Sequence, residues 1–166
     1  MPYLMKQKLW SFGADFTIKD ADGQDRFFVD GKALAIRDQL SFQDLAGREL
    51  AHIKQRLLAW GRTYEISRGG RLFAVVQQKR WTLFKNRFTV DVNDDGPTPN
   101  DLEVEGNFWD HEYAFTRAGQ PVATVSKRYF SWTDTYGVDI APGEDDILLL
   151  ACSVVVDMAT QKKNND

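Results

Sequence analysis

Hydrophobic and polar residues alternate along much of the chain up to about residue 140. In one such stretch Phe88, Val90 and Val92 alternate with Thr89 and Asp91. A period of two residues is typical of a strand with one face buried and the other in water. Turn-forming pairs separate the stretches, at 22–23, 30–31, 46–47, 69–70 and 118–119. Together these signals predict about twelve strands, near 4–10, 14–19, 25–30, 33–42, 49–57, 61–67, 71–79, 82–92, 100–107, 109–117, 120–129 and 133–140. In the first of them, Leu4 and Trp10 are expected to face inward.

The last apolar run, residues 147–156, follows a different pattern. As a helix it is apolar on every side except at Ser153, so it has to be enclosed rather than lie on a surface. A helix of about 14 residues spans about 21 Å, short of the roughly 20 residues that cross a bilayer. Acidic residues 144–146 before the run and Lys162 and Lys163 after it suit the two ends of a helix. The β-branched residues 154–156 leave a buried strand as the alternative.

These two patterns together predict the fold class. A sheet of about twelve strands tends to curl, and closure removes its exposed edges. A barrel of that size is too wide for side chains alone to fill, whereas a threaded helix fills it. We therefore predict a mainly β protein, a closed antiparallel barrel of about twelve strands around a central hydrophobic C-terminal α-helix. Residues 1–166 would form one domain, with strands over about 4–140 and the helix over about 144–160.

The chain also contains an internal repeat. Residues 64–70, with the sequence YEISRGG, resemble residues 113–119, with the sequence YAFTRAG. Ala74 and Val76 then correspond to Ala123 and Val125. The simplest interpretation is a β-meander that occurs twice within one domain, with the loop at 93–100 between the copies.

Composition narrows the class of protein. Of 166 residues, 43% are hydrophobic and 27% are charged, enough for a real core, and the net charge of −3 gives no general attraction to nucleic acid. The single Cys152 lies in the apolar run, where it is expected to pack as a small hydrophobe, and it cannot form an internal disulfide. No signal-peptide pattern precedes the first strand. We expect a cytoplasmic protein that is at most peripheral to a membrane.

Several segments, taken in order, resemble one known family. They are residues 5–18, Asp22–Gly23, 28–33, 45–57 and 64–66. These segments are similar to those of the LURP-one-related proteins, including their bacterial YxjI-like members. The resemblance implies a twelve-stranded barrel around a hydrophobic C-terminal helix, the architecture of the tubby C-terminal domain and of phospholipid scramblases. It implies no catalytic residues. Tubby relatives bind phosphoinositides through basic residues on the barrel surface, but no tubby lipid motif matches this sequence residue by residue.

Basic residues gather in corresponding parts of the two meanders, and aromatic residues lie among them. A basic side chain beside an aromatic ring suits an anionic headgroup, and also single-stranded nucleic acid, which the net charge disfavours. The plainer interpretation is that these residues occupy the solvated outer faces of strands. The candidate site for an anionic headgroup consists of Lys79, Arg80, Lys85, Arg87, Lys127 and Arg128.

Candidate catalytic and metal-binding residues are few. The two histidines, His52 and His111, belong to no recognisable triad, so we expect no enzyme and no cofactor. Asp91, Asn93 and Asp95 match the opening of a calcium-binding loop. The match fails at its twelfth position, which is Leu102 instead of Glu, and the flanks are predicted strands. We therefore expect no metal and keep calcium as an alternative.

Three classes of function follow from the sequence. The first is a non-enzymatic module that binds an anionic lipid headgroup, a phosphoinositide or a membrane surface. The second is a protein-interaction scaffold with a protein partner, and the third is an enzyme of unknown type. No nucleic acid partner is expected. The resemblance and the basic residues favour the first class.

Overall fold

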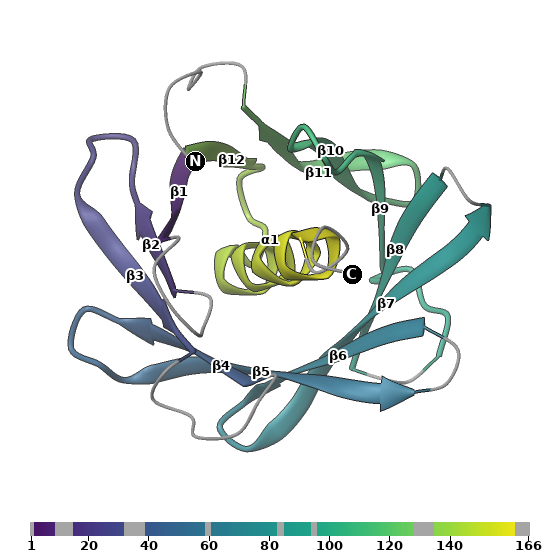
Figure 1. The fold of residues 1–166 in the computed structure, drawn as a ribbon, viewed down its shortest axis with the longest axis horizontal. Helices are drawn as coiled ribbons and strands as arrows, with labels where there is room; N and C mark the ends of the chain where they lie inside the picture. The colour runs from purple at the N-terminus through teal and green to yellow at the C-terminus, as the bar shows by residue number, and fades with distance from the viewer. Residues whose placement is uncertain are drawn as a thin grey trace.

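The computed structural model describes residues 2–8, 15–31, 39–58, 61–82, 85–93, 96–127 and 135–161. Its strands form one closed antiparallel barrel in which sequence neighbours pair and β1 closes against β12. Figure 1 shows the strands surrounding the single helix, α1. The strands are β1 (Pro2–Lys8), β2 (Asp15–Lys19), β3 (Asp25–Asp30), β4 (Gln39–Asp44), β5 (Glu49–Leu58), β6 (Gly61–Arg68), β7 (Arg71–Thr82), β8 (Lys85–Val92), β9 (Leu102–Asn107), β10 (Glu112–Arg117), β11 (Gln120–Ser126) and β12 (Thr135–Ile140). Helix α1 spans Asp146–Gln161.

The predicted fold class is confirmed: twelve antiparallel strands close around a C-terminal helix. The bounds differ at a few places. Residues 109–111, predicted to begin a strand, form a turn in which His111 has a φ of 52°, outside the extended region of a strand. In β1 the buried side chains are Tyr3 and Met5, whereas Leu4 is only half-buried, so the prediction that Leu4 faces inward was wrong; Trp10 lies outside the described residues.

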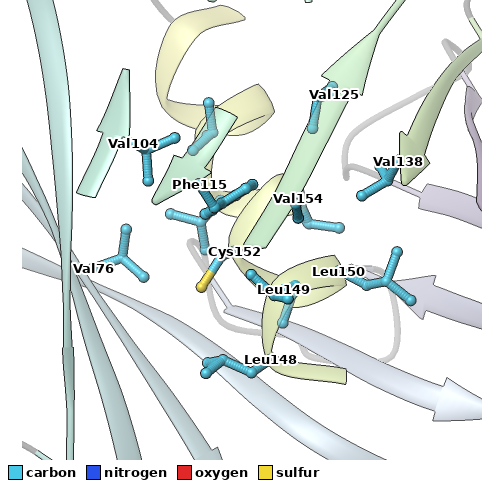
Figure 2. Close-up of a cluster of buried hydrophobic side chains, with 14 of the residues drawn as sticks. Val76, Val104, Phe115, Val125, Val138, Leu148, Leu149, Leu150, Cys152 and Val154 are labelled. Atoms are coloured by element: carbon cyan, nitrogen blue, oxygen red, sulfur yellow. The ribbon is translucent and has the colours of Figure 1, made fainter. Parts of the chain in front are cut away.

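The helix supplies the centre of the core. Every residue from 148 to 160 is buried, so α1 has no solvent-facing side along this length. Figure 2 shows helix side chains packed against inward-facing side chains from several strands of the wall. The labelled helix residues are Leu148, Leu149, Leu150, Cys152 and Val154, and the labelled wall residues are Val76, Val104, Phe115, Val125 and Val138. The all-round apolar run is therefore explained by enclosure on every side.

The barrel has two distinct ends, which we name after the helix. At the N-end, where α1 begins, Arg68 at the end of β6 contacts Asp145 and Arg117 at the end of β10 contacts Glu144. At the C-end, where α1 finishes, Arg62 at the start of β6 donates a 2.7 Å hydrogen bond to the carbonyl of Ala159. Because the strands are antiparallel, the β6–β7 and β10–β11 turns lie at the N-end. The β7–β8 connection and the β9–β10 turn lie at the C-end.

The two copies of the internal repeat place equivalent residues in similar surroundings. Arg68 and Arg117 occupy equivalent positions of the two repeated segments, and both point to acidic residues just before or at the start of α1. Tyr64 and Tyr113, also equivalent, are both buried inside the barrel. The repeated meander therefore presents the same two features to the helix from two parts of the wall.

Candidate functional site

The basic residues of β7 and β8 come together on the outer wall. Lys79 and Arg87 are direct cross-strand partners in the β7–β8 pairing. Their neighbours Gln78 and Phe88 are buried, so Lys79 and Arg87 lie on the opposite, outer face. Lys79 is exposed to solvent. Both residues lie toward the C-end of the barrel.

Arg87 already has acidic partners on the neighbouring strand. Its guanidinium lies 3.1 Å from a carboxylate oxygen of Glu103 and also contacts Glu105, both on β9. These two carboxylates compensate its charge before any ligand arrives. Among the described residues no such pair involves Lys79, which is the better placed of the two to meet an external anion.

Lys127 follows directly after β11 and also lies at the C-end. Its backbone N–H donates a 3.0 Å hydrogen bond to the Glu112 carboxylate, which fixes the chain as it leaves the strand. Strands β9 and β10 separate β11 from β8 in the barrel. Three strand spacings correspond to an arc of about 14 Å. The structure therefore brings Lys79, Arg87 and Lys127 to the same end of the barrel, spread along an arc of its wall.

The remaining predicted basic residues are described only in part. Arg80 and Lys85 belong to the backbone of β7 and β8, and their side chains lie outside the described residues. Arg128 lies outside them altogether. The part of the candidate site that the structure describes is thus Lys79, Arg87 and Lys127.

The calcium alternative falls on the loop between β8 and β9, at the N-end. Asp91 is half-buried near the end of β8, and Asn93 follows in a left-handed conformation with a φ of 74°. Asp101 supports this loop by accepting hydrogen bonds from the backbone N–H groups of Val92 and Thr98, at 3.1 and 2.9 Å. Asp95 lies outside the described residues, so the calcium alternative stays a prediction.

A buried polar cluster between the wall and the helix was missed by the sequence analysis. The Nε2 atom of His111 lies 2.7 Å from Oδ1 of Asp157, and the Asp157 side chain is fully buried. An ionised carboxylate only accepts hydrogen bonds, so Nε2 carries the hydrogen. The His111 ring packs on Tyr136 with ring centroids 4.5 Å apart. One signal was available: Asp157 follows an apolar run that ends inside a barrel, so it needs a partner, and the chain has only two histidines.

Burial and the charge of Asp157 both disfavour ionisation of the tyrosines near this cluster. Burial raises the pKa of both Tyr113 and Tyr136 well above the usual range, and the nearby charge of Asp157 raises them further. Both phenols therefore stay neutral. Burial also raises the pKa of the Cys152 thiol above its usual range, which disfavours the thiolate that a nucleophilic cysteine needs.

At the N-end, acidic groups before and at the start of α1 have partners on three strands. Arg68 donates two hydrogen bonds to Asp145, at 2.8 and 2.7 Å. The Tyr3 hydroxyl donates to Asp146 at 2.5 Å, and its pKa is raised to about 12 by burial and by this hydrogen bond. These contacts fix where the helix enters the barrel. Within the described residues, no helix is long and apolar enough to cross a membrane.

Comparisons with known proteins agree with this architecture. The chain is 34% identical over 154 residues to the uncharacterized protein YxjI of Bacillus subtilis (strain 168), covering 93% of this chain and 90% of that protein. An X-ray structure of a protein from Arabidopsis thaliana superposes with a TM-score of 0.71 at 17% identity, covering 96% of this chain and 91% of that one, so the two share the fold. The sequence model described as LURP-one-related matches residues 1–157. The chain therefore belongs to the LURP-one-related family.

Proposed function

We propose that this protein is a non-enzymatic module that binds anionic lipid headgroups at a membrane surface, through basic residues at the C-end of its barrel. The observation that supports this most directly is the exposed side chain of Lys79 on the outer wall, at the same end as Lys127. Among the residues that the structure describes, no carboxylate pairs with Lys79, so its ammonium is available to a phosphate group, and each such charge near an anionic membrane contributes about 1 kcal/mol.

The resemblance to tubby domains and phospholipid scramblases supports the same choice of ligand. Such a module would act in the cytoplasm, peripheral to a membrane. The net charge of −3 argues against nucleic acid as the anion. A protein-interaction scaffold is the alternative function that the test below separates.

The pairing of Arg87 decides which variant is informative. Reversing Arg87 to Glu would place a third carboxylate beside Glu103 and Glu105, so lost binding and lost stability would be confounded. Lys79→Glu combined with Lys127→Glu avoids Glu103 and Glu105, and because the Lys127 backbone N–H contacts the Glu112 carboxylate, the melting temperature of this variant is measured beside its binding. The matched control is Arg26→Glu combined with Arg71→Glu, which makes the same change in net charge with exposed residues at the N-end.

The test is co-sedimentation with vesicles of phosphatidylcholine alone or mixed with phosphatidylserine. The wild type should bind the mixed vesicles at low salt and lose affinity as salt rises. The Lys79→Glu/Lys127→Glu variant should bind at least about tenfold more weakly, and the control pair should bind nearly as the wild type does. A wild type that ignores anionic vesicles at low salt would show that the lipid proposal is wrong and would leave the scaffold in its place.

A further inference from the structure

The turn between β9 and β10, residues Phe108–His111, exposes a large aromatic side chain. Among the residues that the structure describes, three large hydrophobic side chains are exposed, namely Leu45, Leu72 and Trp109. Leu45 and Leu72 lie at the N-end, in the β4–β5 turn and at the start of β7. Trp109, which is 48% exposed, is the one member of this described set at the C-end. An indole has an apolar body and a polar N–H, the combination that suits a water–membrane boundary.

The turn that carries Trp109 is held at several points. The Asn107 side chain donates a 2.6 Å hydrogen bond to the Asp110 carboxylate, and Asn107 Oδ1 accepts one from the backbone N–H of Asp110. Phe108 is buried and packs against Phe88, with ring centroids 5.1 Å apart. On the other side of Trp109, His111 reaches inward to the helix. With inward anchors on both sides, the indole is presented outward on a fixed turn.

The strand register places Trp109 between the basic residues of the proposed site. Phe88 on β8 pairs with Val104 on β9, so the end of β9 lies beside the start of β8, close to Arg87. On the other side, Tyr113 on β10 pairs with Val125 on β11, which brings the start of β10 beside Lys127. The order along the C-end rim is therefore Lys79 and Arg87, then Trp109, then Lys127.

We propose that Trp109 is the interfacial anchor of a membrane-docking surface formed by Lys79, Trp109 and Lys127. This inference rests on the proposed function and names the apolar part of the same site. The lysines would meet anionic headgroups while the indole enters the interfacial layer beside them. Carboxylates on this rim limit the electrostatic part, because Glu105 and Asp110 are also exposed there. A substantial share of the affinity must then come from the indole.

The experiment measures partitioning onto phosphatidylcholine–phosphatidylserine vesicles for the wild type, Trp109→Ala and Leu45→Ala. Leu45 is 59% exposed at the opposite end, so Leu45→Ala removes a comparably exposed hydrophobic side chain away from the proposed surface. We expect Trp109→Ala to lower the partition coefficient by about tenfold and Leu45→Ala to leave it unchanged. The loss in Trp109→Ala should persist at high salt, whereas the loss in Lys79→Glu/Lys127→Glu should shrink.

A second measurement follows insertion directly. The chain has five tryptophans, so quenching by lipids that carry a nitroxide label is compared between the wild type and Trp109→Phe. Quenching should be weaker in Trp109→Phe than in the wild type, although the variant keeps an aromatic ring at the exposed position; equal quenching would mean that Trp109 does not enter the lipid.

Two further results would overturn the inference, and they are distinguishable. If the wild type binds anionic vesicles and Trp109→Ala binds equally well, Trp109 is no anchor and the proposed function stands. If the wild type does not bind them, the proposed function itself fails and this inference fails with it.

Discussion

The two ends of the barrel hold the same helix by different means. At the N-end, three acidic groups are matched by partners from three strands, in the pairs Glu144–Arg117, Asp145–Arg68 and Asp146–Tyr3. At the C-end one fully buried carboxylate, Asp157, meets His111, and Arg62 covers the carbonyl of Ala159. The N-end contacts are partly in water, whereas the Asp157 side chain is not.

The two ends therefore differ in how much each contact is expected to contribute to stability. Partly exposed ion pairs contribute little individually, and at the N-end two ion pairs and one hydrogen bond from Tyr3 together fix the start of the helix. A buried carboxylate that loses a partner is costly, so the contact between Asp157 and His111 at the C-end is expected to matter more than any one pair at the N-end. The C-end is also where Trp109 and Lys79 are exposed and where Lys127 follows β11. The β9–β10 turn therefore links the proposed docking surface to the helix, with Trp109 outside and His111 inside.

The largest expected effect comes from a substitution inside α1, in the core that lies between the two ends of the barrel. Leu149 is 1% exposed and faces the barrel wall. Leu149→Asp buries a carboxylate without a partner, at a cost of roughly 5 kcal/mol or more, comparable with the whole stability of a small domain. We expect an insoluble or unfolded protein, checked by circular dichroism and thermal melting.

The same substitution at a surface leucine provides the control. Leu45→Asp places its carboxylate in water at the N-end and should melt within a few degrees of the wild type. A soluble Leu149→Asp protein with an unchanged melting temperature would mean that the helix is not the shared core of the two ends.

The next largest effect is expected at the C-end, where His111 contacts Asp157. His111→Phe removes one partner of the buried Asp157 carboxylate and should lower the free energy of unfolding by about 3 kcal/mol or more. Urea titration measures this change. His52→Phe is the matched control, because His52 contacts Glu49 and Gln39 on the outer wall and should lose less than about 1 kcal/mol.

Because His111 has a positive φ, a Phe at this position also adds backbone strain, and a double variant separates that strain from the effect of the buried Asp157 charge. His111→Phe combined with Asp157→Leu removes both partners and should recover part of the loss, because no carboxylate then remains buried. Equal stability of the single and double variants would contradict the assigned role of the pair.

How much of the fold and of the candidate site the sequence could predict depends on how far apart in the chain the contacting residues are. Alternation and the all-round apolar run are local patterns, and they were enough for the barrel and its helix. In β1, however, Tyr3, Leu4 and Met5 are all apolar, so alternation could not choose the inward face. The repeat aligned Arg68 with Arg117 but could not show that both reach the helix.

The candidate site was predictable only in part, for the same reason. Alternation places Lys79 on an outer face, but the pairing of Arg87 with Glu103 depends on the register of β9, which follows a long loop. The contact between His111 and Asp157 joins residues 46 positions apart and carries no periodic signal.

The smallest effect concerns one of the three N-end pairs and its dependence on pH. Burial raises the pKa of Asp145, but hydrogen bonds from Arg68 and from the backbone N–H of Leu148 outweigh it, so the net pKa lies below the usual 3.8. A carboxyl whose pKa is lower in the folded protein stabilises it at neutral pH, and this stabilisation is lost as pH falls through and below 3.8. Arg68→Met should therefore lower the free energy of unfolding by about 1 kcal/mol at neutral pH, a modest value because both side chains are partly in water.

The difference between Arg68→Met and the wild type should shrink as the pH is lowered, and urea titrations from neutral pH down to about pH 3 measure it. Arg71→Met is the control, because Arg71 is exposed at the same turn and should show little difference at any pH. Arg68 has a second contact, since its guanidinium lies 4.1 Å from the centre of the Phe73 ring. A difference that stays constant across this pH range would assign the effect of Arg68 to Phe73 instead of Asp145. The N-end would then hold the helix with two carboxylate contacts, and its contrast with the single buried pair at the C-end would be smaller.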